Sequence, residues 1–239
     1  EALAEMTVVF RFGGGAGGGF VRNVVCEVFA GPGSRVRVVW LQEEPEDAFH
    51  LGTFAAKVGR DARVEATALQ FGAALGRFDA RVRLADQGSS CQVNGLYVAN
   101  GRQHHDSHVE VHHDSGHSDS DVLFKGILDD KASGVFRGNV LIHEGASKST
   151  SNQLNRNLLL TDTATINTKP QLEIDNDDVQ AAHGATVGEL DDNALFYLQT
   201  RGIAAETAAR MMIAGYAAEV LDRLPTEALT EAYSERFSV

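Results

Sequence analysis

The chain has 239 residues, of which 43% are hydrophobic and 23% charged, a balance ordinary for a soluble globular protein with a full core. Its formal net charge is −12 at pH 7, and no basic stripe is present, which argues against nucleic acid and anionic membrane surfaces as partners. No apolar run approaches the length of a membrane span.

Cys26 and Cys91 are the two cysteines of the chain. Two thiols cannot form a disulfide scaffold or a four-thiolate metal site, so we expect both to be reduced and buried in strands of a cytoplasmic protein. The chain opens at Glu1 inside sequence that already has the pattern of folded protein. We therefore expect it to be an N-terminally truncated fragment of a longer polypeptide.

Gly13–Gly19, nearly all glycine, superficially resembles a phosphate-binding loop. It lacks the terminal Gly-Lys-Ser/Thr and leads into a strand-like run, whereas a phosphate loop leads into a helix. We interpret it as a flexible turn or loop.

Short β-type segments dominate residues 1–188. They are β-branched-rich runs, too short for helices, at Arg35–Trp40, Arg63–Leu69, Ala80–Leu84, Gln92–Val98, Val135–Ile142 and Leu172–Ile174. Turn-forming clusters between them recur about every 14 residues after Ser118 and about twice as far apart before it, as expected for coils of two half-turns. This pattern fits a β-solenoid or a β-sandwich. Hairpin dipeptides are almost absent, and Asn94-Gly95 lies within a strand-like run, so we favour a parallel solenoid.

A histidine-rich stretch contains six of the nine histidines: His104, His105, His108, His112, His113 and His117. Such a run suggests a metal site. On an extended strand, however, His108 and His112 would lie about 13 Å apart, and His112 and His113 would point to opposite faces. A shared ion would need neighbouring coils to stack two histidines about 4.8 Å apart. We favour solvated or hydrogen-bonded histidines, with a metal- or partner-binding solenoid as the alternative function.

No complete catalytic constellation is recognisable in the sequence. A Ser/His/Asp nucleophile motif, Cys-x-x-Cys and His-Glu-x-x-His are all missing. A carbohydrate-active β-helix would need paired acids on one face, whereas the adjacent Asp129 and Asp130 project oppositely if extended, and aromatic content is only 7%. We predict a non-enzymatic protein, with a carbohydrate-active β-helix enzyme as a less favoured alternative.

One further histidine, His183, follows the strand-like Val179 and precedes Gly184-Ala185-Thr186, so little bulk surrounds it. An accessible neutral imidazole is a good ligand for iron or zinc. The residues alone leave two interpretations open, a hydrogen-bonded corner histidine and a metal ligand.

Helix-type periodicity replaces the β pattern in residues 189–239. Asp191 or Asp192 is expected to cap a first helix that ends at Arg201, with Gly202 as the residue that follows the cap. This helix begins what we predict to be a small C-terminal helical domain.

A longer helix is expected over Ala204–Leu224, and Pro225 stops it. Thr226 can then cap a last helix that runs to about Arg236. The β-type core of residues 1–188 is thus followed by a helical hairpin or bundle. The sequence leaves open whether these helices only dock on the end of the solenoid or also present a surface to a partner.

Several segments together carry a family resemblance: Gly101–His104, Phe124–Gly126, Gly134–Gly138, Gln153–Leu160, Thr168–Ile174, His183–Gly188, Leu195–Leu198 and Arg201–Ile203. Through them the chain resembles the SufB/SufD family of scaffold proteins of the SUF iron–sulfur cluster assembly system. The region before about Tyr97 matches only in strand pattern. The His-Gly-Ala-Thr-Val-Gly sequence favours the SufD branch over SufB, which looks more like His-Glu-Ala-Thr at that point.

The resemblance implies a right-handed parallel β-helix core with a C-terminal helical domain. It also implies a non-enzymatic scaffold subunit that pairs with SufB through the β-helix and docks the SufC ATPase through the helices. The candidate partner-binding residues are Leu195, Phe196, Tyr197, Arg201 and Gly202. Since a surface made for SufB can be self-complementary, we also expect the isolated chain to be able to form a homodimer.

His183 falls on the family histidine proposed as an iron or cluster ligand at the SufB interface. The resemblance therefore implies that His183 is the cofactor- and metal-binding residue, for a transient iron or iron–sulfur cluster that is not held tightly by the isolated chain. Two departures stand out: Ala181 replaces a cysteine that many SufD sequences have, and Asp175 replaces a frequent tyrosine. Without that softer thiol ligand, a cluster site must depend on His183 and on SufB.

Overall fold

The computed structural model of the protein describes residues 2–14 and 19–237, so residues 15–18 of the glycine-rich segment Gly13–Gly19 lie outside it. The described residues form thirteen strands and three α-helices. The strands are β1 (Glu5–Phe12), β2 (Val21–Ala30), β3 (Arg35–Gln42), β4 (Phe49–Val58), β5 (Arg63–Gln70), β6 (Leu75–Leu84), β7 (Ser90–Ala99), β8 (His104–His113), β9 (Asp119–Leu128), β10 (Ser133–Ile142), β11 (Thr150–Leu159), β12 (Thr165–Ile174) and β13 (Gln180–Gly188). The helices are α1 (Asp192–Thr200), α2 (Ala205–Leu221) and α3 (Glu227–Ser234), followed by the 3-10 helix η1 (Glu235–Phe237).

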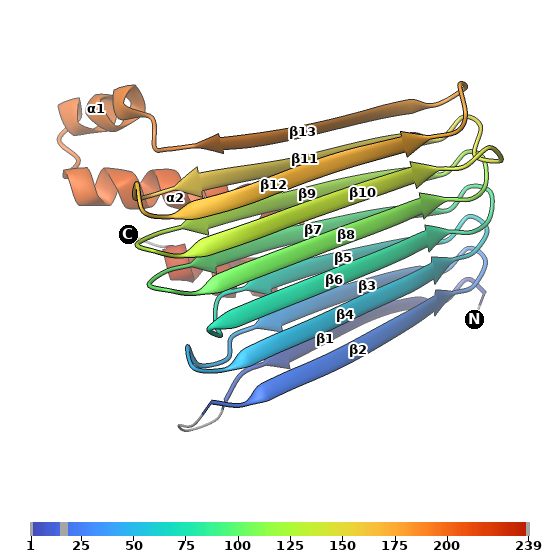
Figure 1. The fold of residues 1–239 in the computed structure, drawn as a ribbon, viewed down its shortest axis with the longest axis horizontal. Coiled ribbons are helices and arrows are strands. Elements are labelled where there is room, and N and C mark those ends of the chain that lie inside the picture. Colours follow the sequence, from blue (N-terminus) through green and yellow to red (C-terminus); the bar gives the residue numbers. More distant parts are fainter. Residues whose placement is uncertain (1, 15–18, 238–239) are drawn as a thin grey trace.

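The strands wind into a right-handed parallel β-helix, as the resemblance implied (Figure 1). Odd-numbered strands form sheet A, in the order β1-β3-β5-β7-β9-β11-β13, and even-numbered strands form sheet B, in the order β2-β4-β6-β8-β10-β12. All pairings between these strands are parallel. One coil takes 26 residues where Phe49 pairs with Leu75 and 32 where Ser133 pairs with Thr165. The predicted solenoid is confirmed, and the sandwich alternative is excluded.

The main core fills the interior between the two sheets. Side chains alternate between interior and outer faces along each strand, so both sheets contribute every second residue to this core. Its large, fully buried members include Trp40, Phe54, Phe124 and Phe136. Cys91 on β7 is buried as predicted, whereas Cys26 is half-buried, because β2 is the edge strand of sheet B.

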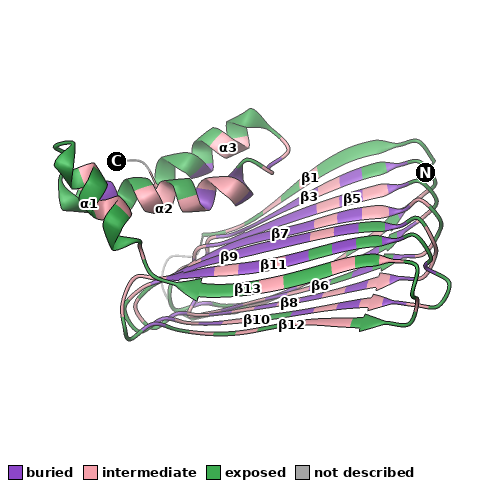
Figure 2. Ribbon diagram, turned by 90° about the horizontal axis from the view of Figure 1, so that it is seen from above, coloured by how far each residue is buried: buried purple, intermediate pink, exposed green. Residues whose placement is uncertain are grey.

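A second apolar cluster attaches the helices to the outer face of sheet A (Figure 2). Its buried members are Val39, Leu41, Leu69, Leu96, Leu123 and Ile127 on the sheet side, and Ala217, Val220, Leu221, Leu224 and Tyr233 on the helical side. The helices therefore cover the flank of the solenoid, whereas the sequence suggested its end. The physical reason is that the outward-facing residues of β3, β5, β7 and β9 are apolar and need cover.

The helix caps follow the sequence prediction closely. Asp191 accepts hydrogen bonds from the backbone amides of Asn193 and Ala194 at the start of α1, and Gly202 after its end has φ +85°. Thr226 likewise caps α3. Among the described helices, none combines the length and apolar character that crossing a membrane would need.

Candidate functional site

The solenoid ends at two strands that have a free edge. β13 is the last strand of sheet A and β12 the last of sheet B, and in the described chain neither has a neighbour on its outer side (Figure 1). Free edges of this kind carry backbone N–H and C=O groups that can pair with another strand. Every residue of β12 and β13 is accordingly exposed or half-buried.

His183 lies on β13 at this open end. It stands in register with Gln153 of β11, whose side chain is buried in the interior. Directly aligned residues of parallel strands point to the same side of a sheet, so His183 belongs to the interior-facing column of β13. No further coil covers that column, and His183 is exposed. The geometry therefore presents an accessible imidazole at the open end of the β-helix.

Gln153, one coil below His183, is an unusual interior residue. Its side chain is 1% exposed, and neither its amide nitrogen nor its amide oxygen has a hydrogen-bond partner. A buried amide without partners is costly, on the order of 1–3 kcal/mol for each lost bond. It packs against Gly138 of β10, where a Cβ would lie 2.2 Å from its nitrogen. Unused hydrogen-bonding capacity thus lies directly below the exposed imidazole.

The rest of this interior column is polar but satisfied. Asn157 donates to the side-chain oxygen of Asn155 at 2.7 Å, and Thr168 of β12 donates to the same oxygen at 2.7 Å. Asn155 in turn donates to the hydroxyl of Tyr97 at 3.3 Å. Burial raises the pKa of the Tyr97 phenol, which keeps it protonated at neutral pH. The polar interior of the last coils is therefore held by a connected set of hydrogen bonds.

Ala181 lies two residues before His183 on the same interior-facing column. It pairs with Ser151 and packs against the edge of the main core. Cys26 and Cys91 lie on β2 and β7, and burial raises the pKa of both thiols. No thiol of this chain is therefore placed to share a metal with His183.

The helices are fixed to sheet A by buried and half-buried ion pairs. The ammonium of Lys125, whose side chain is 4% exposed, lies 2.6 Å from Glu219 and 4.1 Å from the ring centre of Tyr216. Arg223 lies 2.6 Å from Asp121 on the same face. The hydrogen bond from Lys125, together with neighbouring positive charges, holds the pKa of the Glu219 carboxyl below its usual value.

The predicted partner-binding residues lie on and just after α1, which projects beyond the solenoid (Figure 1). Phe196 and Tyr197 are 67% and 57% exposed, while Leu195 is half-buried. The guanidinium of Arg201 stacks on the Tyr197 ring at 5.2 Å, and Gly202 is exposed. Two adjacent exposed aromatic rings on one short helix are unusual for a surface that contacts only water.

The histidine stretch divides between the two faces of β8. His105 and His113 are buried in the interior, where burial lowers the pKa of each imidazole to about 4. His104, His108 and His112 lie on the outer face. As predicted, His112 and His113 point to opposite faces.

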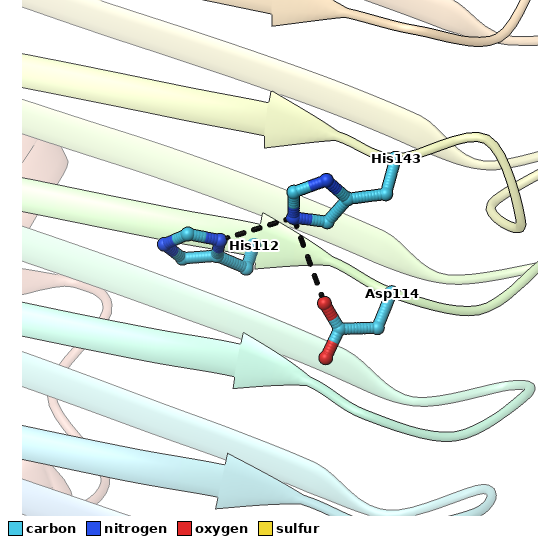
Figure 3. Close-up of side chains that lie close together, drawn as sticks. All are labelled: His112, Asp114 and His143. Carbon is cyan, nitrogen blue, oxygen red and sulfur yellow. Dashed lines mark hydrogen bonds and ion pairs between the residues drawn. The ribbon is translucent and has the colours of Figure 1, made fainter.

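One outward histidine, His112, has a metal-capable neighbourhood that the sequence analysis missed. His112, Asp114 and His143 come together across adjacent coils (Figure 3). The offset of 31 residues between the two histidines is close to the 29 residues that separate the paired His104 and Ser133 on the same two strands. That offset is the signal which could have revealed the pair.

Comparisons with known proteins agree with the geometry. The family model described as SUF system FeS cluster assembly, SufBD core domain, matches residues 1–216. An iron–sulfur cluster assembly SufBD family protein of Synechocystis sp. is 33% identical over 210 residues, which cover 88% of this chain and 46% of that protein. A SufBD family protein of Mycobacterium tuberculosis H37Rv is 34% identical, with 97% of this chain and 59% of that protein covered.

The iron–sulfur cluster assembly protein SufD of Escherichia coli K12 is 35% identical over 174 residues, which cover 73% of this chain and 41% of that protein. The chain spans about half the length of the curated relatives it matches. The family match nevertheless includes all thirteen strands of the β-helix. By this match and these identities, the chain belongs to the SufB/SufD family.

Proposed function

We propose that the chain acts as a SufD-type, non-enzymatic scaffold subunit in cytoplasmic iron–sulfur cluster assembly, and that it pairs with SufB through the open end of its β-helix. The observation that carries this proposal is the exposed His183 on the free edge of β13. Membership of the SufB/SufD family supports it, as does the free edge of β12 beside it.

The pairing follows from the chemistry of strand edges. A partner strand added to β13 would use backbone hydrogen bonds for affinity, and its side chains would continue the interior column. His183 would then lie between the last coil of this chain and the first coil of SufB. Iron, or a nascent cluster, is the cargo at that seam, with the imidazole as one ligand and the softer ligands supplied by SufB.

Gln153 is a candidate hydrogen-bonding group behind His183. Metal-bound imidazoles and cluster sulfurs are tuned by hydrogen bonds from groups just behind them. The unpartnered side-chain amide of Gln153, which is in register with His183, can supply such a hydrogen bond. We assign it a positioning role, because it is buried below the imidazole and is not itself accessible to the cargo.

The SufC contact is proposed for α1. Its exposed Phe196 and Tyr197 offer apolar area at low entropic cost, and the Arg201 side chain is held against the Tyr197 ring. α2, fixed to sheet A by Lys125 and Glu219, is a firm support for this contact. A nucleotide-driven movement of SufC would thereby be transmitted to the β-helix.

The test is anaerobic reconstitution of the native chain with SufB, SufC and ATP, with cluster formation followed by visible absorption. His183→Ala should reduce cluster yield at least tenfold and leave co-purification with SufB intact. His108→Ala, an outward-facing histidine of β8, is the matched control and should behave like the native chain. Equal cluster yield from His183→Ala would remove the ligand role, and absence of any association between the native chain and SufB or SufC would remove the scaffold assignment.

A second variant pair in the same reconstitution tests the helical contact. Phe196→Ala combined with Tyr197→Ala should abolish co-purification with SufC while SufB stays bound. Met211→Ala, which trims another exposed apolar side chain on α2, is the control and should change neither partner. Retention of SufC by the double variant would place its contact elsewhere on the chain.

A further inference from the structure

A cluster of metal-capable side chains lies on sheet B, far from β13 in the chain. His112 is near the end of β8, Asp114 follows that strand, and His143 follows the neighbouring strand β10. Because β8 and β10 pair in register, with His113 opposite Ile142, the residues after both strands leave the sheet at the same corner. Figure 3 shows the three side chains converging there.

The ligand atoms already have nearly the spacing that a bound ion needs. Nδ1 of His112 lies 3.1 Å from Nε2 of His143, and Oδ1 of Asp114 lies 3.7 Å from the same nitrogen. All three ligand atoms lie within 4.8 Å of one another. A tetrahedral ion with bonds of 2.0–2.1 Å holds its ligand atoms about 3.3 Å apart. Small side-chain adjustments would therefore complete the site.

Neighbouring groups orient the ligands toward this point. Nε2 of His112 lies 2.9 Å from a carboxylate oxygen of Glu110, so donation of its N–H there leaves the Nδ1 lone pair facing His143. Carboxylate partners of this kind fix the tautomer of metal-binding histidines. One oxygen of Asp114 accepts a hydrogen bond from Arg83, and the other faces His143. The positive charge of Arg83 opposes a cation, so it limits the affinity.

The site is open to solvent and separate from the other histidines of the stretch. The side chains of His112, Asp114 and His143 are 27%, 18% and 39% exposed, which leaves room for water or another ligand on the ion. His108, on the same face of β8, is instead held 2.9 Å from Asp106 and 3.1 Å from Arg77. A guanidinium beside that histidine disfavours an ion there.

We propose that His112, Asp114 and His143 bind one borderline divalent transition-metal ion, of the class of Zn²⁺ or Fe²⁺, on the outer surface of sheet B. Two imidazoles and one carboxylate form a donor set that these ions accept, with at least one position left open. The hydrogen bond between the two rings is replaced by the ion. This site does not depend on the role of His183, which lies on a different sheet.

The test is titration of the chelator-treated native chain with Co²⁺, whose visible absorption reports its coordination, and with Zn²⁺ by calorimetry. One ion per chain is expected at this site, and His112→Ala and His143→Ala should each weaken binding at least tenfold. His108→Ala is the control and should bind as the native chain does. Native-like binding by His112→Ala and His143→Ala would overturn the proposal, as would a loss of equal size in His108→Ala.

A measurement on the native chain covers the case in which a variant does not fold. Zn²⁺ should shift the ring nitrogen resonances of His112 and His143 and leave those of His108 and His117 unchanged. Shifts spread evenly over the exposed histidines would mean adventitious binding and would also overturn the site.

Discussion

Two interior histidines of β8 sit in an environment that suits only the neutral ring. Nε2 of His105 donates to the carbonyl oxygen of Gly72 at 2.9 Å, while its Nδ1 is buried without a partner. His113 has a serine hydroxyl within 2.8 Å of each ring nitrogen. Burial lowers the pKa of both imidazoles to about 4 from the ordinary 6.5. Protonation of either ring would place an extra charge inside the β-helix.

The free energy of unfolding should therefore decrease as the pH falls through a defined range. Because the folded-state pKa lies below the unfolded one, the stabilising effect is fully present above pH 6.5 and is lost as the pH falls to about 4. Each histidine contributes on the order of 3 kcal/mol across that window. Urea unfolding at several pH values should show a shallower dependence for His105→Gln than for the native chain, while His104→Gln, on the outer face, keeps the native slope. An unchanged slope in His105→Gln would contradict this account.

At the scale of the strands, aromatic rings and glycines occupy matching positions on neighbouring coils. Phe124 of β9 stands in register with Gly95 of β7, and Gly126 of β9 with Tyr97 of β7. A Cβ on Gly126 would lie 2.2 Å from the Tyr97 ring, and one on Gly95 would lie equally close to Phe124. The missing side chains of these glycines thus leave the space into which the adjacent ring packs. This explains why Asn94-Gly95 lies inside a strand instead of forming a hairpin turn.

Gly126→Ala should consequently destabilise the protein by about 1–3 kcal/mol, since the methyl group overpacks a fully buried ring. Gly188→Ala is the matched control on β13, because no atom lies within 4 Å of the Cβ it would add. Thermal or urea unfolding measures both. If Gly126→Ala were as stable as Gly188→Ala, the strands would have to be further apart or differently registered than described.

Considered as a whole, the molecule is a stack of coils with an uncovered end. The free edges of β12 and β13 favour association of the isolated chain with itself, because unpaired strand edges can pair with those of a second copy. We expect a homodimer by light scattering in the absence of SufB. Ala185→Lys adds a charge to the interior-facing column of β13, in register with Asn155, and should give a monomer. Gln87→Lys, in an exposed corner of an earlier coil, is the control; a monomeric native chain would contradict the prediction.

Much of this architecture was predictable because it rests on local chemistry. Turn clusters such as those at Gly31, Gly59 and Gly88 fall at the corner that follows sheet B, where the chain must change direction. The opposite corner of the early coils, as at Phe71–Ala74, has fewer turn residues, which explains the doubled spacing there. The caps at Asp191 and Thr226 are equally local.

The sequence by itself determined the repeating strand pattern and the change to helices after Gly188, and it suggested His183 as a candidate ligand. Each of these depends on residues close together in the chain. Only the tertiary structure decided that His183 is exposed above Gln153, that the helices cover sheet A, and that His112 meets His143. These are contacts between coils, and coil length varies from 26 to 32 residues. Because coil length varies, the register between neighbouring coils is set at each corner, and no local sequence pattern fixes it. That register decides which side chains come into contact.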